Sequence, residues 1–263
     1  MNEFTRLKPL CLIIISGLHV DDLLSVKNFQ ELIIDYPFLT LSSDKNNVFN
    51  FSNSYIELGN GNKLKDINEK NNISLSRVLS DVGLRQLHVA DLDSYAYATY
   101  FFNNRNKTKH EQEEWFKIRS MKCDFNSKSS ESTHNKGTRT LIKEINKQYY
   151  DFIFVNYNDL LINSNKSRVL KEIDKNIKNI IDLVLSFNGL VLISSNSSLV
   201  AQDNRVPLFL IGKIWQGKSF IDYDYEKNFN QQNINGDISQ IAPTILKILG
   251  LLKPRGMKEK SLI

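Results

Sequence analysis

His19, Asp21 and Asp22 form the group best suited to chemistry in this 263-residue chain. They follow the apolar run 10–15, which is typical of a buried strand. Ligands of α/β proteins bind at the carboxyl ends of such strands, where imidazole and carboxylate groups can transfer protons or hold a metal ion. The same residues also make an ordinary loop at the start of a helix, and we prefer this second interpretation.

The other histidines and the two cysteines do not form a second group in the sequence. His88 alternates with apolar residues and is typical of a core or edge position in a strand. His110 lies in a basic run and His134 in a serine-rich segment that we interpret as a loop. Cys11 and Cys123 are far apart in the chain, so their spacing predicts neither a disulfide framework nor a zinc site.

Composition favours one globular domain in a reducing compartment. Hydrophobic residues make up 41% of the chain, enough for a sizeable core, and the formal net charge is only +5. Because the basic residues are scattered among acidic ones, we expect a solvated surface rather than a nucleic-acid site. The run 10–15 is too short to cross a bilayer and lacks a secretory cleavage pattern. We therefore expect a cytoplasmic protein with no membrane or nucleic-acid partner, and an unknown protein partner is possible.

Apolar runs and helical stripes alternate along the chain. Four continuous apolar runs predict strands buried on both faces, at residues 10–15, 152–155, 190–193 and 208–211. Apolar spacing near 3.6 residues predicts helices at residues 28–36, 74–82, 94–102, 138–147 and 169–184. This alternation is typical of an α/β fold of three layers, with a mostly parallel sheet and helices on both faces.

The last part of the chain carries a specific pattern. Asp237-Ile-Ser-Gln-Ile-Ala-Pro-Thr-Ile-Leu-Lys-Ile-Leu-Gly250 predicts a short amphipathic helix, with Ser239 preferred over Asp237 as its N-cap because Pro243 then lies in the first turn. Gly256-Met-Lys-Glu-Lys-Ser-Leu-Ile263 follows. Together with residues 59–64, 73–84, 85–91, 94–103, 150–156 and 205–212, this end resembles the cofactor-independent phosphoglycerate mutases of the alkaline-phosphatase-like metalloenzyme superfamily.

The resemblance implies a fold and a domain organisation. The segments occur in the family's order; for example, residues 85–91 resemble the family's Lys-Gln-Leu-Arg-Ile-Ala-Glu. The family inserts a whole transferase domain at about residues 63–73, where this chain has only a polar segment that we interpret as a surface loop. We therefore expect an alkaline-phosphatase-like core, with residues 1–263 as a single phosphatase-like domain from which the transferase insertion has been deleted.

The resemblance also implies a site with two divalent cations, such as manganese, and a serine nucleophile activated between them. In the family's register the metal ligands fall on six uncharged residues: Ser16, Leu161, Asn165, Asn196, Ser197 and Ala201. The nucleophile falls on Phe51, or on Ser52 after a one-residue slip, and the family's lysine falls on Ser94. Similar slips would add Asp159 or Asp203. Neither replaces a site that needs several charges at once.

Three hypotheses follow from these substitutions. The first is a catalytically inactive relative of the mutases, without a metal cofactor, that acts as a scaffold or binding module. The second is a residual or repurposed phosphate-ester hydrolase or mutase-type enzyme with a rebuilt site that uses His19, Asp21, Asp22 or Asp159. The third is a subunit of a larger assembly, in which a partner covers the former active-site face or the surface exposed by the domain deletion.

Overall fold

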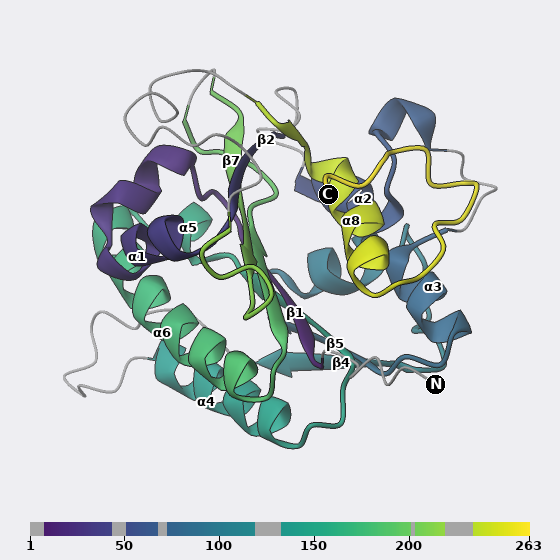
Figure 1. The fold of residues 1–263 in the computed structure, drawn as a ribbon, viewed down its shortest axis with the longest axis horizontal. Coiled ribbons are helices and arrows are strands. Elements are labelled where there is room, and N and C mark those ends of the chain that lie inside the picture. The colour runs from purple at the N-terminus through teal and green to yellow at the C-terminus, as the bar shows by residue number, and fades with distance from the viewer. Residues whose placement is uncertain (1–7, 44–50, 68–72, 119–132, 201–202, 219–233) are drawn as a thin grey trace.

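A single mixed sheet organises the protein, as seen in a computed structural model that describes residues 8–43, 51–67, 73–118, 133–200, 203–218 and 234–263 (Figure 1). Within these ranges the sheet has eight strands in the order β4-β3-β5-β1-β6-β7-β2-β8. The strands are β1 (Leu10–Ile15), β2 (Phe38–Ser42), β3 (Gln86–Asp91), β4 (Glu113–Ile118), β5 (Phe152–Tyr157), β6 (Leu190–Ser194), β7 (Arg205–Ile211) and β8 (Gly236–Asp237).

The expected mostly parallel sheet is confirmed. β1 pairs in parallel with β5 and β6, β3 pairs in parallel with β4 and β5, and β2 pairs in parallel with β8. Only β7 is antiparallel to its neighbours, β6 and β2. The link from β6 to β7, residues 195–204, is too short for the crossover that a parallel pair needs. β7 therefore returns beside β6 in the opposite direction.

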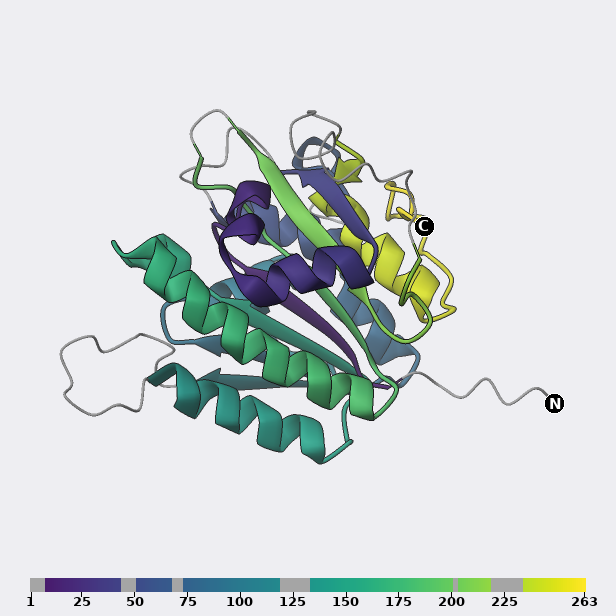
Figure 2. The same ribbon diagram turned by 60° about the vertical axis from the view of Figure 1, so that its left-hand side comes forward.

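Helices cover both faces of the sheet and make the three layers that the sequence predicts (Figures 1 and 2). One layer contains α1 (Lys27–Asp35), α4 (Thr133–Asn146) and α6 (Lys166–Ser186), and α6 contacts both α1 and α4. The other contains α2 (Phe51–Asn60), α3 (Leu75–Asp81) and α8 (Ile241–Ile248), and α2 contacts both α3 and α8. Shorter helical elements are η1 (Val20–Ser25), η3 (Leu64–Asp66), η4 (Tyr97–Phe101), α5 (Asp159–Ile162) and η5 (Ile238–Gln240).

The central strand β1 contributes to the core on both faces. Cys11, Ile13 and Ile15 pack under the α1/α4/α6 layer, whereas Leu10, Leu12 and Ile14 pack under the other layer. Successive side chains of a strand point to opposite faces, and all six are fully buried. The continuous apolar run is therefore explained by a strand covered on both sides, and it places the end of β1 in the middle of the molecule.

Several local predictions are changed by the structure. Asp237, not Ser239, caps the C-terminal helical segment: its carboxylate accepts a hydrogen bond from the Ser239 amide at 3.0 Å. The predicted helix 94–102 contains the π-helical turn η4, and His134 lies in α4 rather than in a loop. Of the expected loop 63–73, residues 68–72 lie outside the described ranges and residues 64–66 form η3. Among the described helices, none is long and apolar enough to cross a bilayer.

Candidate functional site

The carboxyl ends of β5, β1 and β6 bring together several of the residues that the sequence analysis singled out. Ser16 directly follows β1, and Asn196 and Ser197 follow the neighbouring strand β6. Gly17 forms a parallel bridge with Ser198, which holds the two strand ends side by side. Ser16 and Asn196 are fully buried and Ser197 is nearly so. The segments that carry Ser16, Asn196 and Ser197 therefore lie side by side at the carboxyl ends of two central strands.

The centre of this cluster is Tyr55 of α2, which the sequence analysis did not consider. Its hydroxyl lies 2.7 Å from the Ser16 hydroxyl and donates a hydrogen bond of 2.6 Å to Oδ1 of Asn156 near the end of β5. The Tyr55 ring stacks on Tyr97 with a centroid separation of 5.3 Å. Burial raises the pKa of Tyr55 well above its usual value, so the phenol stays protonated as a hydrogen-bond donor. No signal in the sequence separated Tyr55 from other aromatic residues.

Apolar side chains occupy the neighbouring space. Gly17 has a φ of +86°, and a Cβ atom built on it would lie 2.9 Å from side-chain atoms of both Leu161 and Leu199. Leu161, which the sequence analysis predicts to be the counterpart of one family metal ligand, therefore packs close to the backbone that follows β1. A leucine supplies no donor atom to a cation, and the glycine lets the two leucine side chains approach the chain closely.

Two other predicted counterparts of family ligands, Asn165 and Asn196, make local hydrogen bonds. Asn165 caps α6 by accepting a hydrogen bond of 3.1 Å from the Arg168 amide. Asn196 accepts a weak hydrogen bond of 3.4 Å from the Ser197 hydroxyl. Ala201 lies outside the described residues. Asn165 thus contributes to the start of a helix, where a side-chain acceptor satisfies an amide that has no partner within the helix.

The two residues predicted to be counterparts of the family's catalytic residues lie at the starts of helical segments. Phe51 is the first residue of α2, and its carbonyl accepts a hydrogen bond of 3.2 Å from the Ser54 hydroxyl. Ser94 is fully buried, and its hydroxyl donates a hydrogen bond of 2.6 Å to Asp91 at the end of β3. Neither serine hydroxyl has a histidine as hydrogen-bond partner within the described residues. A serine without a base or a metal ion is a weak nucleophile.

His19, Asp21 and Asp22 lie together at the N-terminus of η1, as the sequence predicts, and His19 is the N-cap residue. Asp22 accepts a hydrogen bond of 2.9 Å from the His19 amide, and Nδ1 of His19 accepts one of 3.2 Å from the Asp21 amide. The structure adds Asp203, whose carboxylate lies 3.1 Å from Nε2 of His19. Arg205 contacts Asp203 at 2.7 Å and Asp21 at 3.6 Å. The local helix-start interpretation is therefore correct, and an ion-paired cluster surrounds it.

Arg205 dominates the electrostatics of this second cluster. Its guanidinium donates hydrogen bonds to both carboxylate oxygens of Asp203 and holds the pKa of that carboxyl far below its usual value. Asp203 in turn raises the pKa of Arg205. A carboxylate that is already paired with a guanidinium is a poor ligand for a cation. The link was hard to foresee because Asp203 lies 184 residues after His19 in the chain.

The donor atoms at these positions do not fit a pair of divalent cations. Hard cations require several charged oxygen or imidazole ligands to replace their hydration shell. The described residues contain no group of three or more histidine, cysteine or acidic side chains that could hold a metal ion. At the strand ends, the Ser16 hydroxyl is engaged with Tyr55, and Leu161 supplies only carbon atoms. Ser16, Tyr55 and Leu161 thus supply uncharged hydrogen bonds and carbon atoms, and none of the charged ligands that two divalent cations need.

Residues 49–253 match the family model described as the Metalloenzyme superfamily. The chain belongs to this superfamily. Among its relatives, the 2,3-bisphosphoglycerate-independent phosphoglycerate mutase of Antithamnion sp. is 30% identical over 215 residues, which cover 74% of this chain and 40% of the relative. The corresponding mutase of Ehrlichia canis is 30% identical over 205 residues, covering 73% and 40%. The chain thus spans about two fifths of the length of these superfamily relatives.

Solved structures agree with the superfamily fold. A Leishmania mexicana phosphoglycerate mutase aligns with a TM-score of 0.53 at 16% identity, over 69% of this chain and 38% of that one. A protein of the alkaline phosphatase superfamily from Vibrio parahaemolyticus aligns with a TM-score of 0.63 at 12% identity, over 98% and 70%. A 2-O GAG sulfatase reaches a TM-score of 0.67 at 9% identity, over 97% and 73%. At these identities the likeness establishes the alkaline-phosphatase-like fold alone.

Proposed function

We propose that this chain is a catalytically inactive, phosphoglycerate-mutase-like protein that acts as a scaffold or binding subunit. The observation that supports this most strongly is the hydrogen-bonded cluster of Tyr55, Ser16 and Asn156. It occupies the strand ends at which the resemblance places a dimetal centre. Leu161 contributes carbon atoms beside it. An uncharged, buried cluster offers neither the charges that bind divalent cations nor an activated nucleophile.

The substitutions are consistent with one another in energetic terms. Carboxylates that converge in a buried site repel one another when no cation is present, and they must then take up protons at a cost in stability. Uncharged Ser16 and Asn196 avoid that cost, and so does Leu161. The phenol of Tyr55 supplies a donor for Asn156, which would otherwise be a buried carbonyl oxygen with only a weak partner.

We also propose that residues 1–263 act as one phosphatase-like domain from which the transferase insertion near residues 63–73 is deleted. The C-terminal segment supports this, because it is hydrogen-bonded to the turn after α2. The Asn62 side chain donates to the Gly256 carbonyl at 2.9 Å and accepts from the Lys258 amide at 2.7 Å, and the Glu259 amide donates to the Gly61 carbonyl at 3.2 Å. A cytoplasmic location stays part of the proposal, and the buried, free thiol of Cys11 is compatible with it.

Metal content and turnover test this proposal directly. The purified protein is incubated with a manganese salt, dialysed and analysed by mass spectrometry for bound metal. It is then assayed for turnover of both phosphoglycerate isomers and of an aryl phosphate. A full-length mutase prepared in parallel is the positive control. We expect no stoichiometric metal and no turnover above buffer. Stoichiometric manganese together with turnover would show that a working centre exists and that the assigned register is wrong.

A repurposed hydrolase is the alternative, and the contact between His19 and Asp203 favours it over other enzyme hypotheses. A buried imidazole whose Nε2 lies 3.1 Å from a carboxylate is a possible acid or base. If the protein hydrolyses an aryl phosphate, His19→Ala and Asp21→Ala should abolish that activity. His110→Ala, which removes an imidazole elsewhere, is the matched control. Equal activity in all three variants would exclude this alternative.

A further inference from the structure

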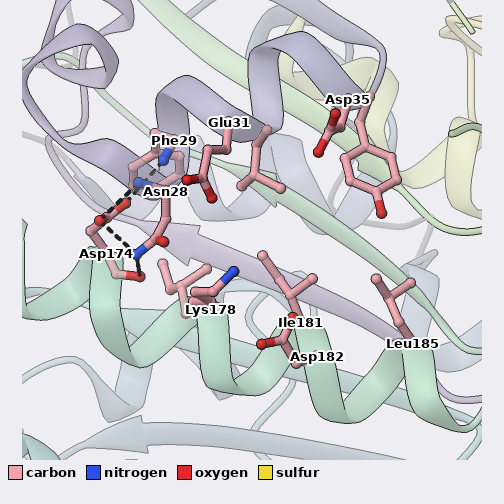
Figure 3. Close-up of a pocket in the computed structure, with 12 residues that line it drawn as sticks. Asn28, Phe29, Glu31, Asp35, Asp174, Lys178, Ile181, Asp182 and Leu185 are labelled. Carbon is pink, nitrogen blue, oxygen red and sulfur yellow. Dashed lines mark hydrogen bonds between the residues drawn. The ribbon is translucent and has the colours of Figure 1, made fainter. Parts of the chain in front are cut away.

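A groove between α1 and α6 lies apart from the strand-end cluster. It has a volume of about 120 Å³ and an apolar floor that includes Leu32, Ile181 and Leu185. Figure 3 shows the two helices as its walls, with Asp174 toward one end and Asp35 and Asp182 farther along. The groove shares no residue with the clusters around Tyr55 and His19. What the groove binds is therefore a separate question from the proposed absence of a metal site.

The walls of the groove are held together by hydrogen bonds. Asp174 of α6 accepts hydrogen bonds from the amides of Asn28 and Phe29, at 3.2 and 3.0 Å, and from the Asn28 side chain at 2.8 Å (Figure 3). Val26, the N-cap of α1, provides no side-chain cap of its own. Asp174 therefore satisfies the first amides of α1 from the neighbouring helix, and the groove exists before any partner binds.

The open end of the groove is acidic. Asp35 and Asp182 are exposed carboxylates from different helices, and Glu31 lines the same wall as Asp35. In the described part of the chain, neither Asp35 nor Asp182 has an ion-pair partner. Lys178 also lines the groove but forms no ion pair with either aspartate. The groove therefore carries a local negative charge, whereas the formal net charge of the whole chain is +5.

Tyr36 also lines the groove and contributes an aromatic ring. Burial, Asp35 and Asp182, in this order, raise the pKa of its hydroxyl. Two carboxylates and an aromatic face are the groups that bind an ammonium or guanidinium ion. The apolar floor next to them can contact the aliphatic stem of a lysine or arginine side chain.

We propose that the α1/α6 groove docks a basic, amphipathic segment of a partner protein, which places a lysine or arginine between Asp35 and Asp182 and an apolar side chain on the floor. Charge complementarity selects this occupant. The groove volume is sufficient for the apolar side chain alone, so the cation and the backbone of the partner segment lie at the rim, where Asp35 and Asp182 are exposed.

Fluorescence anisotropy with a labelled peptide of alternating leucine and lysine blocks tests this proposal on the full chain. The same peptide with glutamate in place of lysine reports apolar binding alone. The test variant is Asp35→Asn with Asp182→Asn. The matched control is Asp66→Asn with Asp81→Asn, which removes the same charge from carboxylates outside the groove that pair with Lys258 and Arg77. Circular dichroism checks that each variant is folded.

We expect the lysine peptide to bind the natural chain and the glutamate peptide not to bind. The groove variant should weaken binding roughly fivefold, the effect of removing two exposed charge contacts, and added salt should weaken it further. The control variant should bind like the natural chain. Equal weakening in both variants would indicate non-specific attraction to negative charge, and no binding at low salt would mean that the groove is not a docking site; either result overturns the proposal. Metal content and turnover are measured separately, so failure here leaves the proposed inactivity untouched.

Discussion

Removal of one oxygen atom, in the variant Tyr55→Phe, tests the core of the structural argument. The Tyr55 hydroxyl is fully buried and connects Ser16 on one side with Oδ1 of Asn156 on the other, at 2.7 and 2.6 Å. Without it, the Ser16 hydroxyl at 3.4 Å is the one hydrogen-bond partner left for Oδ1 of Asn156 among the described residues. Phenylalanine fills the same volume apart from the oxygen, so the change removes hydrogen bonds and leaves the ring stacked on Tyr97.

The size of the effect follows from the two hydrogen bonds. A buried hydrogen bond contributes about 0.5–1.5 kcal/mol net to stability, and a buried acceptor left with a poor partner costs about 1–3 kcal/mol. We therefore expect Tyr55→Phe to lower the free energy of unfolding by about 2 kcal/mol. If the site were a functional centre that stores strain, the same substitution would be neutral or stabilising.

Denaturant unfolding followed by circular dichroism and tryptophan fluorescence measures this difference as a shift of the midpoint at constant slope. Tyr97→Phe is the matched control, because that ring stacks on Tyr55 but its hydroxyl makes no hydrogen bond among the described residues. The control should change stability by less than about 0.5 kcal/mol. Equal effects of the two variants would refute the assignment of Tyr55 to the centre of the cluster.

Three further predictions concern other parts of the fold. Gly59→Ala should prevent stable folding, seen as loss of soluble protein or of a cooperative melt, because a Cβ there would lie 1.9 Å from the Phe102 carbonyl oxygen. Glu113→Ala should lower the free energy of unfolding by about 3 kcal/mol, measured by denaturant unfolding. The buried carboxylate accepts hydrogen bonds from the Asn103 side chain, and its removal leaves that buried amide without these acceptors. The pKa of Asp203 is lowered in the folded state, so the carboxylate stabilises the fold at pH values above its unfolded pKa of 3.8, and this stabilisation is lost as the pH falls further. In Asp203→Asn, the free energy of unfolding should therefore fall less steeply at acidic pH than in the natural chain. An unchanged decrease at acidic pH would contradict this.

The layers of the fold could be predicted because their signals are local. The run 10–15 became β1 with the same bounds, and the apolar stripe 169–184 lies within α6. A strand covered on both faces needs a continuous apolar run, and a helix packed on a sheet needs one apolar stripe. The sequence patterns of such elements are complete within a few residues, and the resemblance of the C-terminal segment then indicated the superfamily.

Contacts between distant segments could not be predicted in the same way. Tyr55 reaches Ser16 across 39 residues and Asn156 across 101 residues, and the sequence carries no mark that distinguishes it from other tyrosines. Arg205 joins Asp21 to Asp203 only because β7 runs back beside β6 and brings its first residue toward η1. The same holds for Asp174, which caps a helix 145 residues before it.

The sequence by itself determined the α/β class, the main strands and helices, and the uncharged character of the positions that the resemblance aligns with metal ligands. The tertiary structure decided which uncharged groups meet: Tyr55 bonded to Ser16 and Asn156, Leu161 close to Gly17, and Asn165 used as a helix cap. The physical reason is the distance along the chain over which each effect acts. Burial patterns act through neighbours along the chain, whereas a hydrogen bond across the core depends on where whole elements pack.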